Sequence, residues 1–164
     1  MRKALLVFLL IITTQTCKNP YLPPMKEIQK AKSKVLRSKL PFLLLSLPVL
    51  QGGDGKAGVF PHLLPLATKT IKKLNFHLIP YNLVGDSLKS FAPPHTSLYS
   101  LKMGGPIHKS EDPIGLKVED IWENDQIHCI RLNSVEIVYD NYEIELIEEP
   151  EKLKTIAPFS KCPE

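Results

Sequence analysis

Residues 116–149, LKVEDIWENDQIHCIRLNSVEIVYDNYEIELIEE, contain the clearest pattern of secondary structure in the chain. The stretch divides into four short runs that are rich in β-branched and aromatic residues, at 116–123, 126–133, 135–140 and 142–149. The pairs between the runs favour tight connections and are Asn124-Asp125, Asn133-Ser134 and Asp140-Asn141. The pattern predicts four short antiparallel strands joined by turns.

The last run alternates between apolar and acidic residues. Tyr142, Ile144 and Leu146 share one side of an extended chain, and Glu143 and Glu145 share the other. A strand of this kind belongs to a sheet that covers a core with one face only. We therefore expect the apolar side to face the core. Glu143 and Glu145 are expected on the surface, where their charge suits a basic protein partner.

Outward from this stretch, the chain continues with weaker strand patterns. The runs 81–87 (YNLVGDS) and 96–103 (TSLYSLKM) are two further candidate strands. The sequence thus predicts a mainly β domain over residues 78–149, a small antiparallel sheet or open barrel of about six short strands. Residues 59–77 are expected to be irregular with one short helix around 66–74, and residues 150–164 to be a flexible tail.

Residues 17–58 have the composition of a membrane-proximal tether and linker. Good helix formers at 26–39 place Ile28, Ala31, Val35 and Leu36 roughly on one side of a basic helix. The run 40–50 is apolar but contains two prolines, so it either packs on the domain or dips into a membrane interface. The glycine-rich run 51–58 (QGGDGKAG) is expected to be a hinge at the domain boundary.

The N-terminus has the pattern of an export signal. Met1-Arg2-Lys3 is followed by an unbroken apolar run at 4–12, which is too short to span a bilayer and suits a signal peptide over residues 1–16. Cys17 stands where a bacterial lipoprotein carries its lipid, although Thr14 and Thr16 occupy positions that usually hold Leu and a small residue. We expect lipid attachment at Cys17; ordinary cleavage and an uncleaved anchor are the alternatives.

Three residues in the C-terminal half leave two interpretations open. In an oxidising compartment Cys129 and Cys162 can pair, but one lies in a predicted strand and the other in a predicted tail, which favours separate thiols. Trp122, the single tryptophan, is either a core residue or a contact for a partner.

Charge is divided sharply along the chain. Residues 18–39 contain seven basic residues and only Glu27 as an acid, whereas residues 111–151 contain thirteen acids against Lys117 and Arg131. The first segment therefore suits an anionic membrane surface and the second a basic protein partner, unless both are simply solvated. An acidic folded domain argues against nucleic-acid binding.

Patterns that would indicate an enzyme were not found. The five histidines are not paired at metal-ligand spacings, and Gly55-Lys56 lacks the flanking residues of a phosphate-binding loop. The aspartates near the predicted turns have no readable catalytic companion. We expect a non-enzymatic protein with no catalytic residue, metal, cofactor or small-molecule substrate.

The order of the strands and turns resembles the periplasmic β-domain of two bacterial envelope families. These are the type IV pilus assembly lipoprotein P and the homology region of the type II secretion protein C. The stretches that carry the resemblance are Leu83-Val84-Gly85, Ser97-Leu98-Tyr99, Asp112-Pro113-Ile114-Gly115, Lys117-Val118 with Ile121, Asp125-Gln126-Ile127, Asn133-Ser134 and Glu143-Ile144-Glu145-Leu146. The chain departs from the pattern where Glu111 and Ser134 replace turn glycines.

The resemblance implies a scaffold without catalysis on the periplasmic side of a bacterial membrane. Its β-domain would dock on a secretin or another envelope-assembly protein, through an exposed strand edge or through its acidic face. The alternative is an exported lipoprotein that binds a small ligand or a host molecule, which requires a large apolar pocket.

Overall fold

The computed structural model describes residues 22–90, 95–124, 126–160 and 162. The predicted signal peptide at 1–16 and Cys17 lie outside these residues. The two helices are α1 (Met25–Arg37) and α2 (Pro150–Ile156). The strands are β1 (Phe42–Ser46), β2 (Val49–Gln51), β3 (Ala57–Val59), β4 (His62–Pro65), β5 (Ile71–Tyr81), β6 (Tyr99–Ile107), β7 (Ile114–Gly115), β8 (Val118–Trp122), β9 (Cys129–Tyr139) and β10 (Ile144–Ile147).

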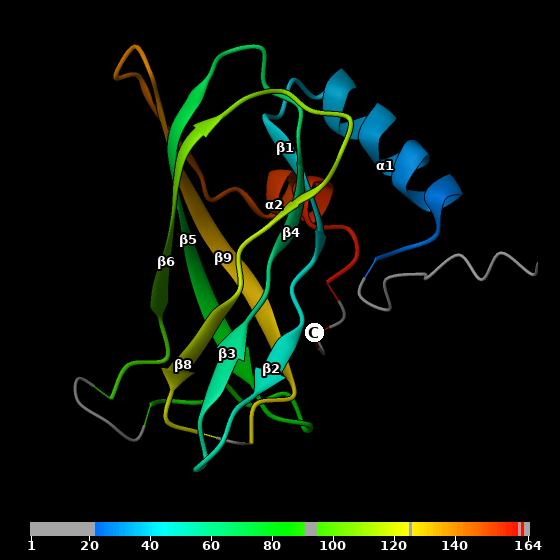
Figure 1. Cartoon of the computed structure of the whole chain (residues 1–164). Helices are drawn as coiled ribbons and strands as arrows, with labels where there is room; N and C mark the ends of the chain where they lie inside the picture. The colour runs from blue at the N-terminus through cyan, green and yellow to red at the C-terminus, as the bar shows by residue number, and fades with distance from the viewer. Residues whose placement is uncertain (1–21, 91–94, 125, 161, 163–164) are drawn as a thin grey trace, which may run out of the picture.

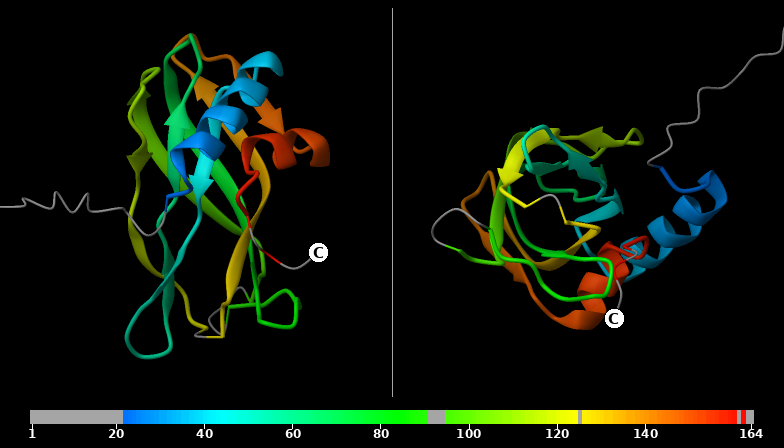
Figure 2. Two further views of the ribbon diagram at one scale, coloured as in Figure 1. Left: turned by 90° about the vertical axis from the view of Figure 1, so that its right-hand side faces the viewer. Right: turned by 90° about the horizontal axis from the view of Figure 1, so that it is seen from below.

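The strands form three antiparallel sheets. The largest has the order β10-β9-β5-β6, and the two smaller sheets have the orders β1-β4-β7 and β2-β3-β8. Figure 1 shows the long strands β5 and β9 running behind the shorter strands, with α1 on the outside of the molecule. The views in Figure 2 show the same layering from the side and from below. The prediction of a mainly β fold is confirmed.

One hydrophobic core lies between the large sheet and the two small ones. Phe42 on β1 meets Phe76 on β5 edge to face, with ring centroids 5.8 Å apart, and neither side chain is exposed. Tyr99 on β6 and Trp122 on β8 pack with their ring planes tilted by 57° and their centroids 5.2 Å apart. Each fully buried side chain of this size contributes about 1.5–3 kcal/mol, so these contacts join the sheets into one folding unit.

The expectation that residues 17–58 are a tether and linker is wrong for residues 40–58, and of the two alternatives for the apolar run 40–50, packing on the domain is the one observed. Phe42, Leu43 and Leu45 on β1 are completely buried, and the strand pairs with β4. The glycine-rich run is the tip of the β2–β3 hairpin, where Gly55 has a positive φ of 72°. Glycine serves this tight turn, and the run is no boundary because strands on both of its sides belong to the core.

Residues 59–77 are also strand, contrary to the predicted irregular segment and short helix. They contain β4 and the first half of β5. Along β5, Leu74, Phe76 and Leu78 point into the core in the two-residue period of a strand. The helix formers before them were a weaker signal than this alternation, because pairing with both β6 and β9 decides the local structure.

The predicted strand at 81–87 is a turn beyond the end of β5. The side-chain oxygen of Asn82 accepts hydrogen bonds from the backbone N–H groups of Val84 and Asp86, at 3.1 and 2.8 Å. Gly85 adopts a positive φ of 94°. The local hydrogen bonds of Asn82 thus replace a sheet ladder, and Leu83-Val84-Gly85, one of the stretches behind the family resemblance, is exposed turn.

Two of the remaining predicted strands merge, and residues 150–156 of the predicted tail form a helix. β9 runs without a break through Asn133, where the pairing with β5 shifts by one residue, so Asn133-Ser134 forms a bulge rather than a turn. After β10 the chain forms α2, whose Ile156 is completely buried. The chain then reaches Cys162, which is bonded to Cys129. The disulfide corrects the expectation of separate thiols, because α2 folds the predicted tail back onto β9.

Candidate functional site

The large sheet has two edges of different character. At one edge, β6 contains Gly104, Gly105 and Pro106, and proline has no backbone N–H to offer another strand. The other edge is β10, which pairs with β9 and with no other strand of the described residues. Its four residues, IELI, contain neither proline nor glycine. β10 is therefore the edge at which a further strand can be added.

The backbone of β10 presents hydrogen-bonding groups to solvent. The N–H of Tyr139 donates to the carbonyl of Glu143 at 3.0 Å, and Glu145 and Ile147 continue that ladder opposite β9. In an antiparallel pair the groups of alternate residues point away from the partner strand. The N–H and C=O groups of Ile144 and Leu146 thus point outward from the sheet edge.

Ile144 and Leu146, together with Tyr142 just before β10, also expose apolar side chains. Tyr142 is 74% exposed, Ile144 64% and Leu146 53%. We call these three residues the β10 strip. They make up a large share of the exposed large hydrophobic side chains of the described chain, and they fall within five residues of each other. An apolar group of this kind on the surface is typical of an interaction site.

The prediction that Tyr142, Ile144 and Leu146 face the core is wrong. Glu145 pairs with Ile137 and Ile147 pairs with Val135, and these partners are buried. Since paired residues share a face, the odd-numbered side of β10 points inward. The register of the β9–β10 hairpin places the apolar side of the alternating pattern towards solvent. Alternation in the sequence shows that a strand has two different sides, but not which of them faces the core.

The two carboxylates predicted to meet a partner are both engaged within the chain. Glu143 accepts hydrogen bonds from Lys69 at 2.6 Å and from Asn141 at 3.3 Å, which hold the pKa of its carboxyl below the ordinary value. Glu145 accepts a hydrogen bond from the hydroxyl group of Tyr139 at 2.6 Å. Both line a pocket of about 490 Å³. Both carboxylates therefore lie close to the strip, but on the opposite face of β10.

The Tyr139 hydroxyl should make the free energy of unfolding decrease at alkaline pH. Burial, and then the hydrogen bond to Glu145, raise the pKa of Tyr139 in the folded protein. Its contribution to folding is therefore complete below the unfolded pKa of about 10 and is lost as the pH rises from there towards the folded-state pKa. In urea unfolding at increasing pH, Tyr139→Phe should lack this part of the decline. Tyr142→Phe, at an exposed ring, should follow the wild type; equal curves for all three would contradict the argument.

Trp122 is not a surface residue. Its side chain is 2% exposed, between Tyr99 on β6 and the β3 strand, where it pairs with Ala57. The interpretation of Trp122 as a partner contact is therefore wrong for this fold, and the core interpretation holds. The physical reason is that β8 belongs to an inner small sheet, so its bulky side chain fills the space between two sheets.

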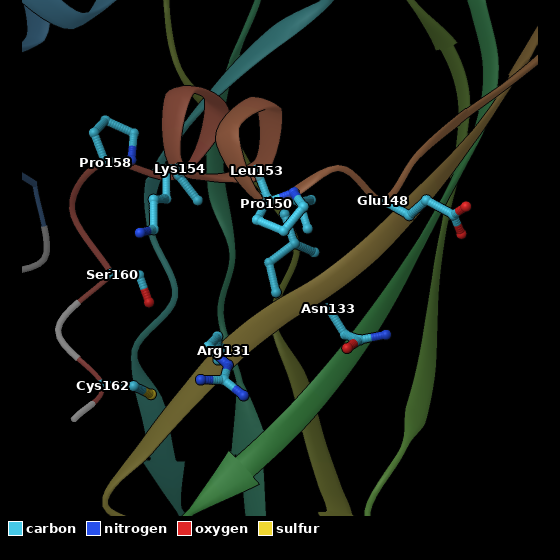
Figure 3. A pocket seen from close by; sticks show the side chains of 11 residues that line it. Arg131, Asn133, Glu148, Pro150, Leu153, Lys154, Pro158, Ser160 and Cys162 are labelled. Carbon is cyan, nitrogen blue, oxygen red and sulfur yellow. The ribbon is translucent and has the colours of Figure 1, made fainter. Parts of the chain in front are cut away.

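A second candidate surface is a groove of about 630 Å³ between β9 and the C-terminal segment. Figure 3 shows Arg131 and Asn133 on β9 facing Leu153 and Lys154 of α2, with Cys162 at one end. The guanidinium of Arg131 lies 4.6 Å from the ring centroid of Tyr81 and donates to its hydroxyl. Both charged and apolar side chains line this groove. The sequence did not indicate the groove, because residues 150–164 were expected to be a flexible tail and not a helix.

No group of three or more His, Cys, Asp or Glu side chains in the described ranges is placed to hold a metal ion. His62 is buried, its Nδ1 lies 3.0 Å from the Ser46 hydroxyl, and burial lowers its pKa. In the same ranges neither helix is long and apolar enough to cross a bilayer.

Of the stretches that carry the family resemblance, Glu143-Ile144-Glu145-Leu146 contributes to the candidate site and contains most of β10. Asp112-Pro113-Ile114-Gly115 leads into the short strand β7, and Asn133-Ser134 is the bulge in β9. Compared with protein-family models, with curated proteins and with solved structures, the chain matches none of them.

Proposed function

We propose that this chain is a non-enzymatic, exported and membrane-tethered binding module that docks a protein partner on the β10 edge. The observation that carries the proposal is the combination of outward backbone groups and exposed Ile144 and Leu146 side chains on the same strand. The system we propose is a secretion or type IV pilus assembly machinery, with a secretin-like protein as the partner. This assignment rests on the family resemblance.

The disulfide supports export. Bonds such as Cys129–Cys162 form and persist outside the cytoplasm, whereas cytosolic thiols are kept reduced. The signal-like residues 1–16 and Cys17 as the lipid attachment site point the same way. Together they support a location on the periplasmic side of a bacterial membrane.

Docking at β10 would follow the general mode of strand addition. The partner's backbone would bond the N–H and C=O groups of Ile144 and Leu146, and its side chains would cover theirs. On the opposite face of the added strand, the partner would lie beside Glu143 and Glu145. Because opposite charges are favourable and like charges unfavourable between neighbouring strands, a partner strand that alternates apolar and basic residues fits best.

A photo-crosslinking amino acid at Leu146, in cells that naturally produce the chain, tests this proposal. We expect covalent capture of a secretin or a pilus-assembly protein, because the side chain would be covered by the partner strand. Changing Ile144 to Lys in the same chain should abolish the capture, since a charge would be buried without a counter-ion. Both positions are exposed, so folding should change little.

The matched control places the crosslinker at Lys102, which is exposed on β6 at the opposite edge of the same sheet. Capture of the same protein from both positions would indicate mere proximity. Capture from neither, or capture at Leu146 of a second copy of this chain alone, would contradict docking on an assembly partner.

The groove beside the disulfide favours a second function, binding of a small ligand by an exported lipoprotein. Its volume of about 630 Å³ lies within the range of ligand pockets. However, Arg131, Lys154 and Glu148 line it together with apolar residues, so it does not have the mainly apolar wall of a carrier. We place this function second for that reason.

A further inference from the structure

Helix α1 has one buried side and one strongly basic side. Ile28 and Val35 are buried against the domain, and Ala31 is half-buried between them. At about 100° per residue, Lys26, Lys30, Lys34 and Arg37 fall within roughly a quarter of the helix circumference, on the side away from these apolar residues. All four are exposed. We call them the α1 basic face.

The burial of the apolar side changes what this helix can do. A free amphipathic helix would insert its apolar side between lipids. Here Ile28 and Val35 are already buried in the core, and α1 packs against β1 and α2, so the exposed surface of the helix is mainly its charged side, with Met25 and Leu36 as exposed apolar residues on its flank. Lys32, on the flank nearer the domain, donates to Glu111 at 2.6 Å. The α1 basic face remains as a compact positive surface, with Glu27 as the acid beside it.

We infer that the α1 basic face rests on the anionic phospholipid headgroups of the membrane to which the chain is tethered. Besides charge, chain length supports this occupant. Cys17 is eight residues before Met25, and a fully extended chain of that length reaches at most about 28 Å. A lipid at Cys17, which is part of the proposed function, would thus keep α1 close to the headgroups.

Contact through α1 would leave the docking edge free. Glu143 and Glu145 line a pocket with Leu36 and Lys39 at the C-terminal end of α1, whereas Ile144 and Leu146 lie on the other face of β10. The contact between the α1 basic face and the membrane would therefore fix the orientation of the module. The basic helix faces the membrane and the β10 strip faces away from α1, towards the partner.

Lysine footprinting of the full chain reconstituted in vesicles tests the contact. The chain is labelled with a water-soluble amine reagent in vesicles of phosphatidylcholine alone and in vesicles that also contain phosphatidylglycerol. We expect the labelling of Lys26, Lys30 and Lys34 to fall several-fold with the anionic lipid and to recover in high salt, which screens headgroup charge. Lys102, exposed on β6, should be labelled equally in both.

A charge-matched pair of variants provides the second measurement. Each basic residue near an anionic surface is worth about fivefold in affinity, so changing the four residues of the α1 basic face to Gln should reduce the preference for anionic over neutral vesicles by about a hundredfold or more. Both variants carry Cys17→Ala to remove the lipid. The control changes Lys56, Lys89, Lys102 and Lys117 to Gln and should keep most of the preference.

Equal labelling of the three lysines in both kinds of vesicle would overturn the inference, and so would an equal loss in the two variants. These outcomes are independent of the proposed docking. If the lysines remain reactive while Leu146 still captures its partner, the membrane contact alone fails. If the lysines are protected and Leu146 captures nothing, the proposed function alone fails.

Discussion

Trp122→Ala is expected to lower the free energy of unfolding by about 3–5 kcal/mol, as for other large aromatic side chains removed from a core. The side chain is 2% exposed, and its ring centroid lies 5.2 Å from that of Tyr99, between two sheets. Domains of this size are stable by roughly 5–15 kcal/mol, so the variant should remain folded but unfold at much lower urea concentration. Circular dichroism follows the transition without relying on the removed fluorophore.

Tyr142→Ala is the matched control for this prediction. Tyr142 is 74% exposed, and its ring contacts the Lys72 ammonium at 4.2 Å, a contact worth about 0.5–1 kcal/mol at the surface. A loss at Trp122 no larger than that at Tyr142 would refute the core position of the tryptophan. In that case the interpretation of Trp122 as a partner contact would return.

Removal of the Cys129–Cys162 disulfide is expected to lower the free energy of unfolding by about 3–4 kcal/mol. The bond closes a loop with a sequence separation of 33 residues. A cross-link over such a loop lowers the conformational entropy of the unfolded chain, which raises the free energy of the unfolded state by about 3–4 kcal/mol. The double variant Cys129→Ser/Cys162→Ser should therefore unfold at lower urea concentration than the oxidised wild type. A reducing agent added to the wild type should reproduce the shift.

Proteolysis distinguishes a local from a general effect of this bond. The disulfide holds the segment after α2 against β9, so its loss should make the chain after Ile156 more accessible to protease before the sheets open. Peptide mapping of the oxidised protein provides the direct control. Free thiols at both Cys129 and Cys162 would show that the two cysteines do not pair and would remove the main structural support for export.

The strand pattern was most informative where it was longest. The helix predicted at 26–39 is present as α1, and the stretch 116–149 contains β8, β9 and β10. The alternation of Leu74, Phe76 and Leu78 is equally regular, but the mixed pattern of residues 59–77 was interpreted as an irregular segment with a short helix around 66–74. A strand such as β5 receives its stability from β6 and β9, so its own residues need not favour it strongly.

The sequence singled out the strand that contains the candidate site, but not the side chains that the strand exposes. It indicated the run 142–149 and the carboxylates of Glu143 and Glu145, and in the structure β10 is one of the two edges of the large sheet. Which side of that strand faces inward depends on the pairing of Glu145 with Ile137. A shift by one residue would exchange the two faces, and nothing within the run itself fixes that register.

Local composition and periodicity were enough to predict the mainly β class and the basic helix, and they also predict the signal peptide at 1–16. Three features could be seen only in the folded chain: residues 40–77 belong to the core, Cys162 is bonded to Cys129, and Ile144 and Leu146 face solvent. These three features depend on contacts between segments of the chain that are not adjacent in the sequence. The residues of one segment do not show which other segment they will contact, or in which register.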